Sequence, residues 1–330
     1  MTRDYWITAR DLYNYTKCPY RVYVDTHGDP AEKGEVSEFT KLLWEMGLQT
    51  EREYLESLGG KPVTDLSSFD PAKAWDRTLE AMQQGNELIY QGYLAHGRLR
   101  GRPDLLLRRE DAPSNWGDYH YEPIDIKAGK GWEERDGKPV KFKEHYAFQM
   151  MLYREMLQAI QGYVPPAARI INVEQEIEEF DPAPFEDAYS EAKDEVEGLI
   201  SGRESSEPAL GSHCQQCEWF GHCETWVEEN DDPTRVFFIG RAAKVGLKEA
   251  GLRTVRDLAN MEIEKYLKPP FKIPGMAKRS LERAKERAEV VLSGKPKIRP
   301  GYSFPSVGTE IYFDIEDDPT RGITYLLPRA

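Results

Sequence analysis

The stretch that decides the fold begins Gly101-Arg102-Pro103-Asp104, continues through Leu105-Leu106-Leu107 and a polar loop, and ends Tyr121-Glu122-Pro123-Ile124-Asp125-Ile126-Lys127. Two apolar runs around a loop rich in charge, Pro, Ser, Asn and Gly predict a β-hairpin. Side chains two apart on a strand point the same way, so Asp125 and Lys127 share a face. Such groups are costly to desolvate, which indicates a site. Two carboxylates converging on a divalent metal beside a lysine can cleave phosphodiesters; the alternative is a strand with one solvated, charged face.

Composition narrows the class of protein. The chain has 330 residues, enough for one large domain and a smaller one, and 31% of them are charged. No apolar run is long enough to span a bilayer, and the N-terminal residues 1–6 lack the apolar core of a signal peptide. We therefore expect a cytoplasmic protein with no membrane partner. Four cysteines in that compartment are expected to bind metal rather than form disulfides.

Charge is distributed unevenly along the chain. The net charge of -14 argues against non-specific coating of nucleic acid. Residues 265–300, however, carry eleven Lys and Arg against three Glu, and a smaller basic run, Arg98 to Arg109, flanks Asp104. Contact with a nucleic acid would therefore be confined to these basic segments.

Hydrophobic periodicity predicts an α/β or α+β sheet core over about the first 200 residues. Helices are expected over residues 7–27 (with Thr8 as the N-cap), 37–58, 71–84, 143–161 and 184–200. Strands are expected over residues 88–90, 93–95, 104–107, 121–127 and 168–173.

The predicted helix 143–161 carries Gln149 and Tyr153 four residues apart, hence on one face. Neighbouring Met and Leu residues supply its core side. An amide and a phenol aimed at the strand of Lys127 could orient that lysine or hold a phosphate. The alternative is a buried helix with two polar edges.

The cysteines form a three-plus-one pattern: Cys214, Cys217 and Cys223 are clustered, and Cys18 stands apart near the N-terminus. Four thiolates suit an iron–sulfur cluster, whereas zinc could also use His213 or His222. The spacing leaves both open. Either metal would act as a structural staple between the N-terminal helix and the end of the sheet domain.

The order of these motifs resembles the RecB-like branch of the PD-(D/E)XK nucleases over about residues 8–228. That branch has a Gly-led helix with an acid or His, then Gly-x-x-Asp, Asp-x-Lys and Gln-x3-Tyr. The resemblance implies an α/β fold, a restriction-endonuclease-like mixed sheet flanked by helices. It also implies Mg²⁺ or Mn²⁺ bound by Asp104, Asp125 and the Ile126 carbonyl, with Lys127 positioning or activating the attacking water.

Further catalytic residues follow from the same resemblance. Gln149 and Tyr153 match the Gln-x3-Tyr helix. In the first motif the branch commonly has His or Glu about four residues after a Gly. Here Gly47 is followed four residues later by Glu51, which becomes the candidate catalytic residue and metal ligand. Glu45 and Glu53 lie near it in the sequence.

The cysteine pattern resembles the iron–sulfur members of that branch, which include AddB and the CRISPR-adaptation exonucleases. In these, one Cys precedes the nuclease core and Cys-x2-Cys-x5-Cys follows it. The resemblance implies a 4Fe–4S cluster on Cys18, Cys214, Cys217 and Cys223, with Zn²⁺ as the alternative.

Two downstream segments, 236–259 and 273–288, look like helix-hairpin-helix units, which bind phosphate through a Gly-containing turn. The alternative is a helical linker with a solvated basic face. Residues 310–316 resemble the first strand of a DEDD, RNase H-like exonuclease. Because the chain ends at Ala330, we expect only the beginning of such a domain, and no working site at Asp314 and Glu316.

Together these features predict a metal-dependent DNA nuclease, an exonuclease on single-stranded DNA in repair, recombination or CRISPR-related processing. The expected domains are a nuclease domain over 1–228 with a metal staple of four cysteines, a small α-helical nucleic-acid-binding region over 233–295, and the incomplete RNase H-like strand over 305–330. The alternative is a catalytically silent nucleic-acid-binding adaptor in which the four cysteines hold a structural metal.

Overall fold

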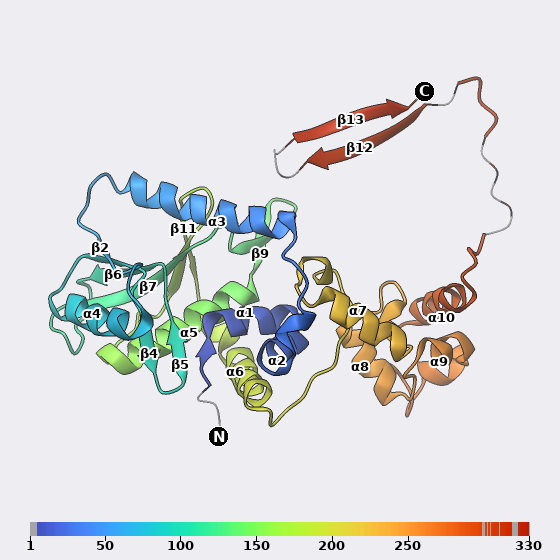
Figure 1. Cartoon of the computed structure of the whole chain (residues 1–330), viewed down its shortest axis with the longest axis horizontal. Coiled ribbons are helices and arrows are strands. Elements are labelled where there is room, and N and C mark those ends of the chain that lie inside the picture. The colour runs from blue at the N-terminus through green and yellow to red at the C-terminus, as the bar shows by residue number, and fades with distance from the viewer. Residues whose placement is uncertain are drawn as a thin grey trace. The chain divides into compact units, whose positions relative to one another are not determined.

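The computed structural model describes residues 5–298, 301, 303, 305–309, 311–318 and 323–329. The chain forms two compact units (Figure 1). The first comprises Met1–Gly28 with Leu43–Ser206, and the second Asp29–Leu42 with Glu207–Ala330. The domain boundaries expected from the sequence remain predictions.

A six-stranded mixed sheet forms the centre of the first unit, in the order β11-β10-β7-β6-β3-β2. Its strands are β2 (Thr64–Asp65), β3 (Leu88–Tyr90), β6 (Leu105–Arg109), β7 (His120–Ile126), β10 (Ala168–Ile171) and β11 (Ile177–Phe180). The predicted hairpin is present: β6 and β7 pair antiparallel, with Leu105 opposite Ile124. β10 lies parallel to β7, which requires a crossover, and a helix supplies it.

Helices flank this sheet. They are α1 (Ala9–Lys17), α2 (Pro19–His27), α3 (Glu38–Ser57), α4 (Pro71–Gln83), α5 (Glu144–Gln161) and α6 (Glu186–Ser201). Helices α4 and α5 share a core with one sheet face, where Met82 and Phe148 are buried near Tyr121. The last turns of α3 cover the other face through Tyr54 and Leu55, and Leu58 directly after the helix joins them. The expected fold, a mixed sheet flanked by helices, is confirmed.

Short strands complete the first unit. A three-stranded sheet, in the order β1-β5-β4, consists of β1 (Ile7–Thr8), β5 (Leu99–Gly101) and β4 (Leu94–His96). A separate hairpin joins β8 (Trp132–Arg135) to β9 (Lys138–Phe142). Of these, only β4 was expected, because strands of two to five residues are too short to establish a period.

The single helix expected over residues 7–27 is wrong. Thr8 caps α1 as predicted, with Asp11 completing a capping box, but the helix ends at Lys17. Cys18 has an extended backbone (φ -161°, ψ 105°), and α2 begins at Pro19. The residue before a proline is disfavoured in the helical region, so Cys18 breaks the helix in two.

The second unit is mainly helical: α7 (Phe220–Glu229), α8 (Arg241–Glu249), α9 (Val255–Asn260), the 3-10 turn η5 (Ile263–Leu267) and α10 (Lys278–Ser293). Its own core includes Leu247, Leu258 and Leu281. Two turns contain a glycine with positive φ, Gly251 (88°) between α8 and α9 and Gly275 (71°) before α10. Only glycine adopts this conformation freely.

The last elements are the antiparallel strands β12 (Tyr312–Asp318) and β13 (Ile323–Arg329). The side chains of Asp314 and Glu316 lie outside the described part of the chain.

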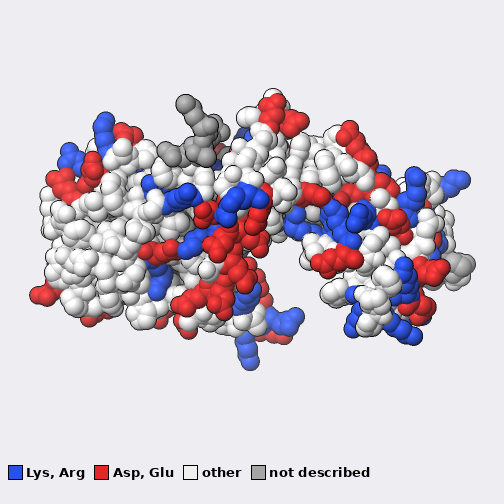
Figure 2. Space-filling view, turned by 90° about the horizontal axis from the view of Figure 1, so that it is seen from below, with Lys and Arg blue, Asp and Glu red and all other residues white. Residues whose placement is uncertain are grey.

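Charged side chains mark the surface unevenly. Figure 2 shows acids gathered over α6, which has six Asp and Glu and one Lys. Over the second unit, Lys and Arg alternate with acids. None of the described helices is long and apolar enough to cross a membrane.

Candidate active site

Asp104 and Asp125 come together at the start of the central hairpin. Asp104 directly precedes β6, and Asp125 lies in β7 one position beyond the partner of Leu105. The amide of Asp104 donates a hydrogen bond to Asp125 Oδ1 (3.2 Å), and the amide of Ile126 donates to Asp104 Oδ2 (2.7 Å). Each carboxylate is therefore fixed by the backbone of the other strand.

Lys127 completes this pair, as the alternation along β7 predicts. Its Nζ lies 2.8 Å from Asp125 Oδ2 and 2.9 Å from Gln149 Oε1. Gln149 reaches it from α5, and the ring of Tyr146 lies 5.1 Å from the same ammonium group. The sequence identified Gln149 but not Tyr146. An ammonium ion with a carboxylate, an amide oxygen and an aromatic ring around it is held in one orientation.

Glu51 joins the site through a residue that the sequence did not reveal. The side-chain nitrogen of Gln91, Nε2, donates to Glu51 Oε1 (2.8 Å) and to Asp104 Oδ1 (2.9 Å). Gln91 also has a positive φ of 54°, which is uncommon for a residue other than glycine. No sequence motif marks this position, because the contact joins α3 to a loop 40 residues away.

The structure also distinguishes among the three glutamates near the first motif. Glu51 lies three, four and seven residues before Tyr54, Leu55 and Leu58, which pack against the sheet. It therefore shares their face of α3. Glu53 instead accepts a hydrogen bond from Gln49 at an exposed position, and Glu45 is exposed.

The electrostatics of the cluster suit a divalent cation. Burial raises the pKa of Asp104 well above its usual value, and the neighbouring charge of Asp125 raises it further. Burial alone would lower the pKa of Lys127, but the charges of Asp125 and Asp104 outweigh it and the pKa is raised. The charges of Asp104 and Asp125 thus act on one ammonium ion, and Glu51 adds a third carboxylate near Asp104. Oxygen donors with this excess of negative charge fit Mg²⁺ or Mn²⁺.

The side chains do not form a complete metal cage. Among the described residues, no group of three or more His, Cys, Asp or Glu is placed to hold a metal ion. Asp104 and Asp125 are the adjacent carboxylates, and Glu51 reaches them through the Gln91 amide.

Tyr153 is buried close to Asp125 and Asp104, whose charges add to the effect of burial in raising the pKa of its phenol. Its side chain is buried, and its hydroxyl is 3.5 Å from the Arg102 carbonyl. Burial raises the pKa of Tyr153 well above its usual value, so the phenol stays neutral. A Cβ on Gly101 would lie 2.6 Å from Cε1 of this ring, which explains why the motif needs glycine there. The structure thus places Tyr153 as a support for the segment that leads into Asp104.

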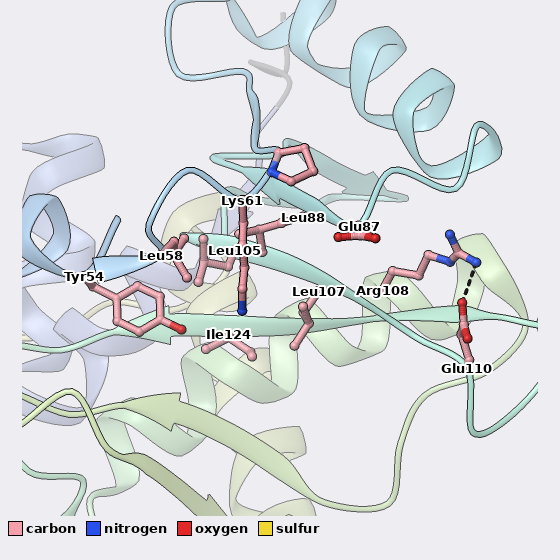
Figure 3. A pocket seen from close by; sticks show the side chains of 11 residues that line it. Tyr54, Leu58, Lys61, Glu87, Leu88, Leu105, Leu107, Arg108, Glu110 and Ile124 are labelled. Carbon is pink, nitrogen blue, oxygen red and sulfur yellow. Dashed lines mark hydrogen bonds and ion pairs between the residues drawn. The ribbon is translucent and has the colours of Figure 1, made fainter. Parts of the chain in front are cut away.

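A pocket of about 370 Å³ opens on the opposite face of the sheet (Figure 3). Leu105, Leu107 and Ile124 of β6 and β7 line it together with Tyr54 and Leu58. None of the six predicted catalytic residues lines it. The acidic cluster is therefore separate from this pocket, whose lining also includes the charged Lys61, Glu87, Arg108 and Glu110.

The cysteines occupy both units. Cys18 links α1 to α2 in the first. In the second, Cys214 begins the 3-10 turn η3 (Cys214–Gln216), Cys217 follows that turn, and Cys223 is buried in α7. The sulfur of Cys214 accepts a hydrogen bond from the Gly211 amide (3.3 Å).

Two aspartates and a lysine gathered at a hairpin of a mixed sheet are groups of the kind that metal-dependent phosphodiester cleavage uses. The chain belongs to the PD-(D/E)XK nuclease superfamily: the family model matches residues 27–224, which include Glu51, Asp104, Asp125, Lys127 and the Gln149 helix. Membership implies nuclease activity on a nucleic-acid substrate, typically with Mg²⁺. A comparison with curated proteins gives no match.

Proposed function

We propose that this protein is a RecB-like, Mg²⁺- or Mn²⁺-dependent deoxyribonuclease that acts as an exonuclease on single-stranded DNA. The observation that carries the proposal is the hydrogen-bonded set of Asp104, Asp125, Lys127 and Gln149 at the central hairpin. Superfamily membership supports the nuclease class. Exonuclease action, strand type and a role in repair, recombination or CRISPR-related processing rest on the resemblance of the motifs.

Each residue has a role in the proposed hydrolysis. Asp104, Asp125 and the Ile126 carbonyl would hold the cation, and Glu51 would complete its surroundings. The bound metal supplies Lewis acidity and a more acidic water. Lys127 orients the attacking water and stabilises the negative charge that develops on the phosphate. Gln149 holds Lys127 in place, and Tyr153 supports the backbone before Asp104.

The decisive experiment compares Asp104→Ala, Asp125→Ala and Lys127→Ala with the wild type in the presence of Mg²⁺ or Mn²⁺. Each variant is expected to lose at least about a hundredfold in cleavage rate, because each removes charge stabilisation of the transition state. The exposed Asp76→Ala and Lys73→Ala on α4 are matched controls and should remain active. Single- and double-stranded substrates labelled at either end report strand type and polarity.

Wild-type cleavage by all three site variants would contradict the assignment of the site. DNA binding by the wild type without turnover in any divalent metal would instead support the catalytically silent adaptor.

We further propose that Cys18, Cys214, Cys217 and Cys223 hold a 4Fe–4S cluster, with Zn²⁺ as the alternative. The spacing of the cysteines supports four thiolate ligands, and the Gly211 amide that donates to Cys214 is a contact that cluster sulfurs commonly accept. Anaerobically purified protein should be brown and contain iron and sulfide. Colourless protein with stoichiometric zinc would overturn the cluster.

We also propose that the second unit binds the phosphate backbone as a helix-hairpin-helix region. Of its two glycine turns, the one at Gly275 before α10 is better suited to bind phosphate. Ala277 leaves the N-terminus of α10 without a side-chain cap, and Lys278 and Arg279 follow. At α9, by contrast, Thr254 already caps the helix. An uncapped helix N-terminus with adjacent cations favours phosphate. Arg279→Ala should weaken DNA binding and reduce the salt slope by about one.

A further inference from the structure

Two adjacent phenylalanines of the second unit face solvent. Phe237 and Phe238 are 71% and 75% exposed, more than any other described phenylalanine. Their rings lie 4.1 Å apart. The residues on either side, Val236 and Ile239, are buried in the core of the unit. The segment is therefore anchored at both ends and displays the two rings between its anchors.

The backbone under the rings is a strained turn. The Ile239 amide donates to the Val236 carbonyl (2.9 Å), which places Phe237 and Phe238 at the two central positions of a β-turn. Phe238 has a positive φ of 72°, at a position where such turns favour Gly or Asn. A bulky residue in this conformation is strained, and strain of this kind often accompanies a functional site.

Arg287 of α10 contacts both phenylalanines. Its Nη1 donates to the Phe237 carbonyl (3.0 Å), and its guanidinium carbon lies 4.8 Å from the Phe238 ring centre and 5.8 Å from that of Phe237. A planar cation packed on aromatic rings orders them. The two phenyl rings are thus held in place before any ligand arrives.

A cavity of about 490 Å³ adjoins the pair. Its lining combines the cations Arg235, Arg287 and Lys297 with the apolar Val290 and Val291 beside Phe237. Glu286 adds an acid to the lining, and two of the cations have carboxylate partners: Arg235 pairs with Asp231 (3.1 Å) and Lys297 with Glu289 (3.0 Å). The exposed aromatic rings beside this aliphatic surface are complementary to a ligand with flat rings.

We propose that Phe237 and Phe238, ordered by Arg287, form a stacking site for unpaired bases of a DNA single strand. Bases within a duplex are stacked on one another and cannot reach such rings, whereas an unpaired base gains about 1–3 kcal/mol from an aromatic partner. Arg235 and Lys297 would exchange their carboxylate partners, Asp231 and Glu289, for phosphates of the same strand. The inference rests on the proposed nuclease function for its ligand, and it adds a selective determinant that is distinct from the phosphate-binding turns.

The test measures binding of the full chain to a labelled oligothymidine and to a duplex of equal length, with EDTA present so that nothing is cut. Phe237→Ala and Phe238→Ala together should weaken single-strand binding by about ten- to a hundredfold, the effect of losing 1–3 kcal/mol. Duplex binding should change less than about twofold. Phe271→Ala is the matched control, because Phe271 is 42% exposed and also has a lysine, Lys265, over its ring.

Phe238→Gly separates a binding role from a structural one. Glycine relieves the positive φ, so the variant should unfold at a higher temperature than the wild type while binding single strands more weakly. Tyrosine at either position should preserve binding, because its ring still stacks.

Three results would overturn the stacking site: unchanged single-strand binding by the double variant, equal loss for both DNAs, or a wild-type dimer on gel filtration that the double variant abolishes. The last would identify the rings as a contact between copies. Failure of the nuclease proposal is a separate result, since Asp104→Ala abolishes cleavage only if the first unit is the catalyst, whereas the binding assay needs no turnover.

Discussion

Lys127 and Gln91 illustrate how single side chains define this site. Lys127 is 14% exposed and makes two short contacts, one with Asp125 and one with Gln149, so its ammonium group has little freedom. Gln91 places its side-chain nitrogen, Nε2, between the carboxylates of Glu51 and Asp104. Gln91 Nε2 donates a hydrogen bond to an oxygen of each carboxylate. A cation at the position of this nitrogen would attract the same two oxygens.

We predict that Gln91→Glu destabilises the protein without metal and makes it more responsive to metal. Glutamate at this position would add a fourth carboxylate to Glu51, Asp104 and Asp125. Glu51 and Asp104 would then lose the hydrogen bonds that Gln91 Nε2 donates, and the free energy of unfolding should fall by about 1–3 kcal/mol. Ca²⁺ should restore more stability to this variant than to the wild type. Thermal unfolding with EDTA and with Ca²⁺ measures both effects.

Gln49→Glu is the matched control, because Gln49 also donates to a glutamate but at an exposed position of α3. It should shift stability by less than about 0.5 kcal/mol. Equal behaviour of the two variants would contradict the role given to Gln91.

At the scale of elements, the packing of α5 against β5 positions the site. Tyr153 of α5 fills the space above Gly101, the last residue of β5, and Gly101 is three residues before Asp104. Helix α5 therefore contributes twice: Gln149 holds Lys127, and Tyr153 supports the chain that carries the first aspartate.

Gly101→Ala should cost about 1–3 kcal/mol of stability, because its methyl group would overlap the Tyr153 ring. It should also slow cleavage by displacing Asp104. Denaturant unfolding and single-turnover cleavage measure the two effects. A Gly101→Ala variant as stable as the wild type would refute this packing.

Gly47→Ala is the opposite case. Apart from its chain neighbours and the backbone of its own helix, nothing lies within 4 Å of the added carbon. Because the position is inside α3, alanine should add up to about 1 kcal/mol of stability.

At the scale of the whole molecule, the two units have separate cores and separate buried ion pairs. In the second unit Lys244 is 5% and Asp232 3% exposed, with 2.5 Å between Nζ and Oδ2. Lys244 also donates to the Pro208 carbonyl (2.6 Å), and Asp232 caps the turn at Thr234. Such a pair connects α8 to the segment before it.

Lys244→Met should destabilise the second unit by about 3–5 kcal/mol, because it leaves the Asp232 charge buried without its partner. Hydrogen exchange should accelerate in α8 and α9, while β6 and β7 stay protected by their own core. Adding Asp232→Asn should recover part of the loss.

Lys278→Met, which removes an exposed pair with Glu264, should cost less than about 1 kcal/mol and is the control. Equal acceleration of exchange in β7 would show that the units do not unfold separately.

The sequence by itself determined the hairpin and much of the site. Alternation placed Asp125 and Lys127 on one face, and helical spacing placed Gln149 and Tyr153 together, because these relations are local and periodic. The break at Cys18 was also encoded by Pro19, although the predicted helix ran through it.

Only the tertiary structure decided the remaining contacts. The rotation of α3 about its axis selects Glu51 over Glu45 and Glu53, and that rotation is fixed by apolar residues packing on a distant sheet. Gln91 and Tyr146 approach the site across gaps in sequence that no period spans. In the second unit, the exposure of Phe237 and Phe238 depends on which of four consecutive apolar residues the core accepts. Local periodicity sets which residues share a face, whereas burial depends on what packs against that face, and this comes from elsewhere in the chain.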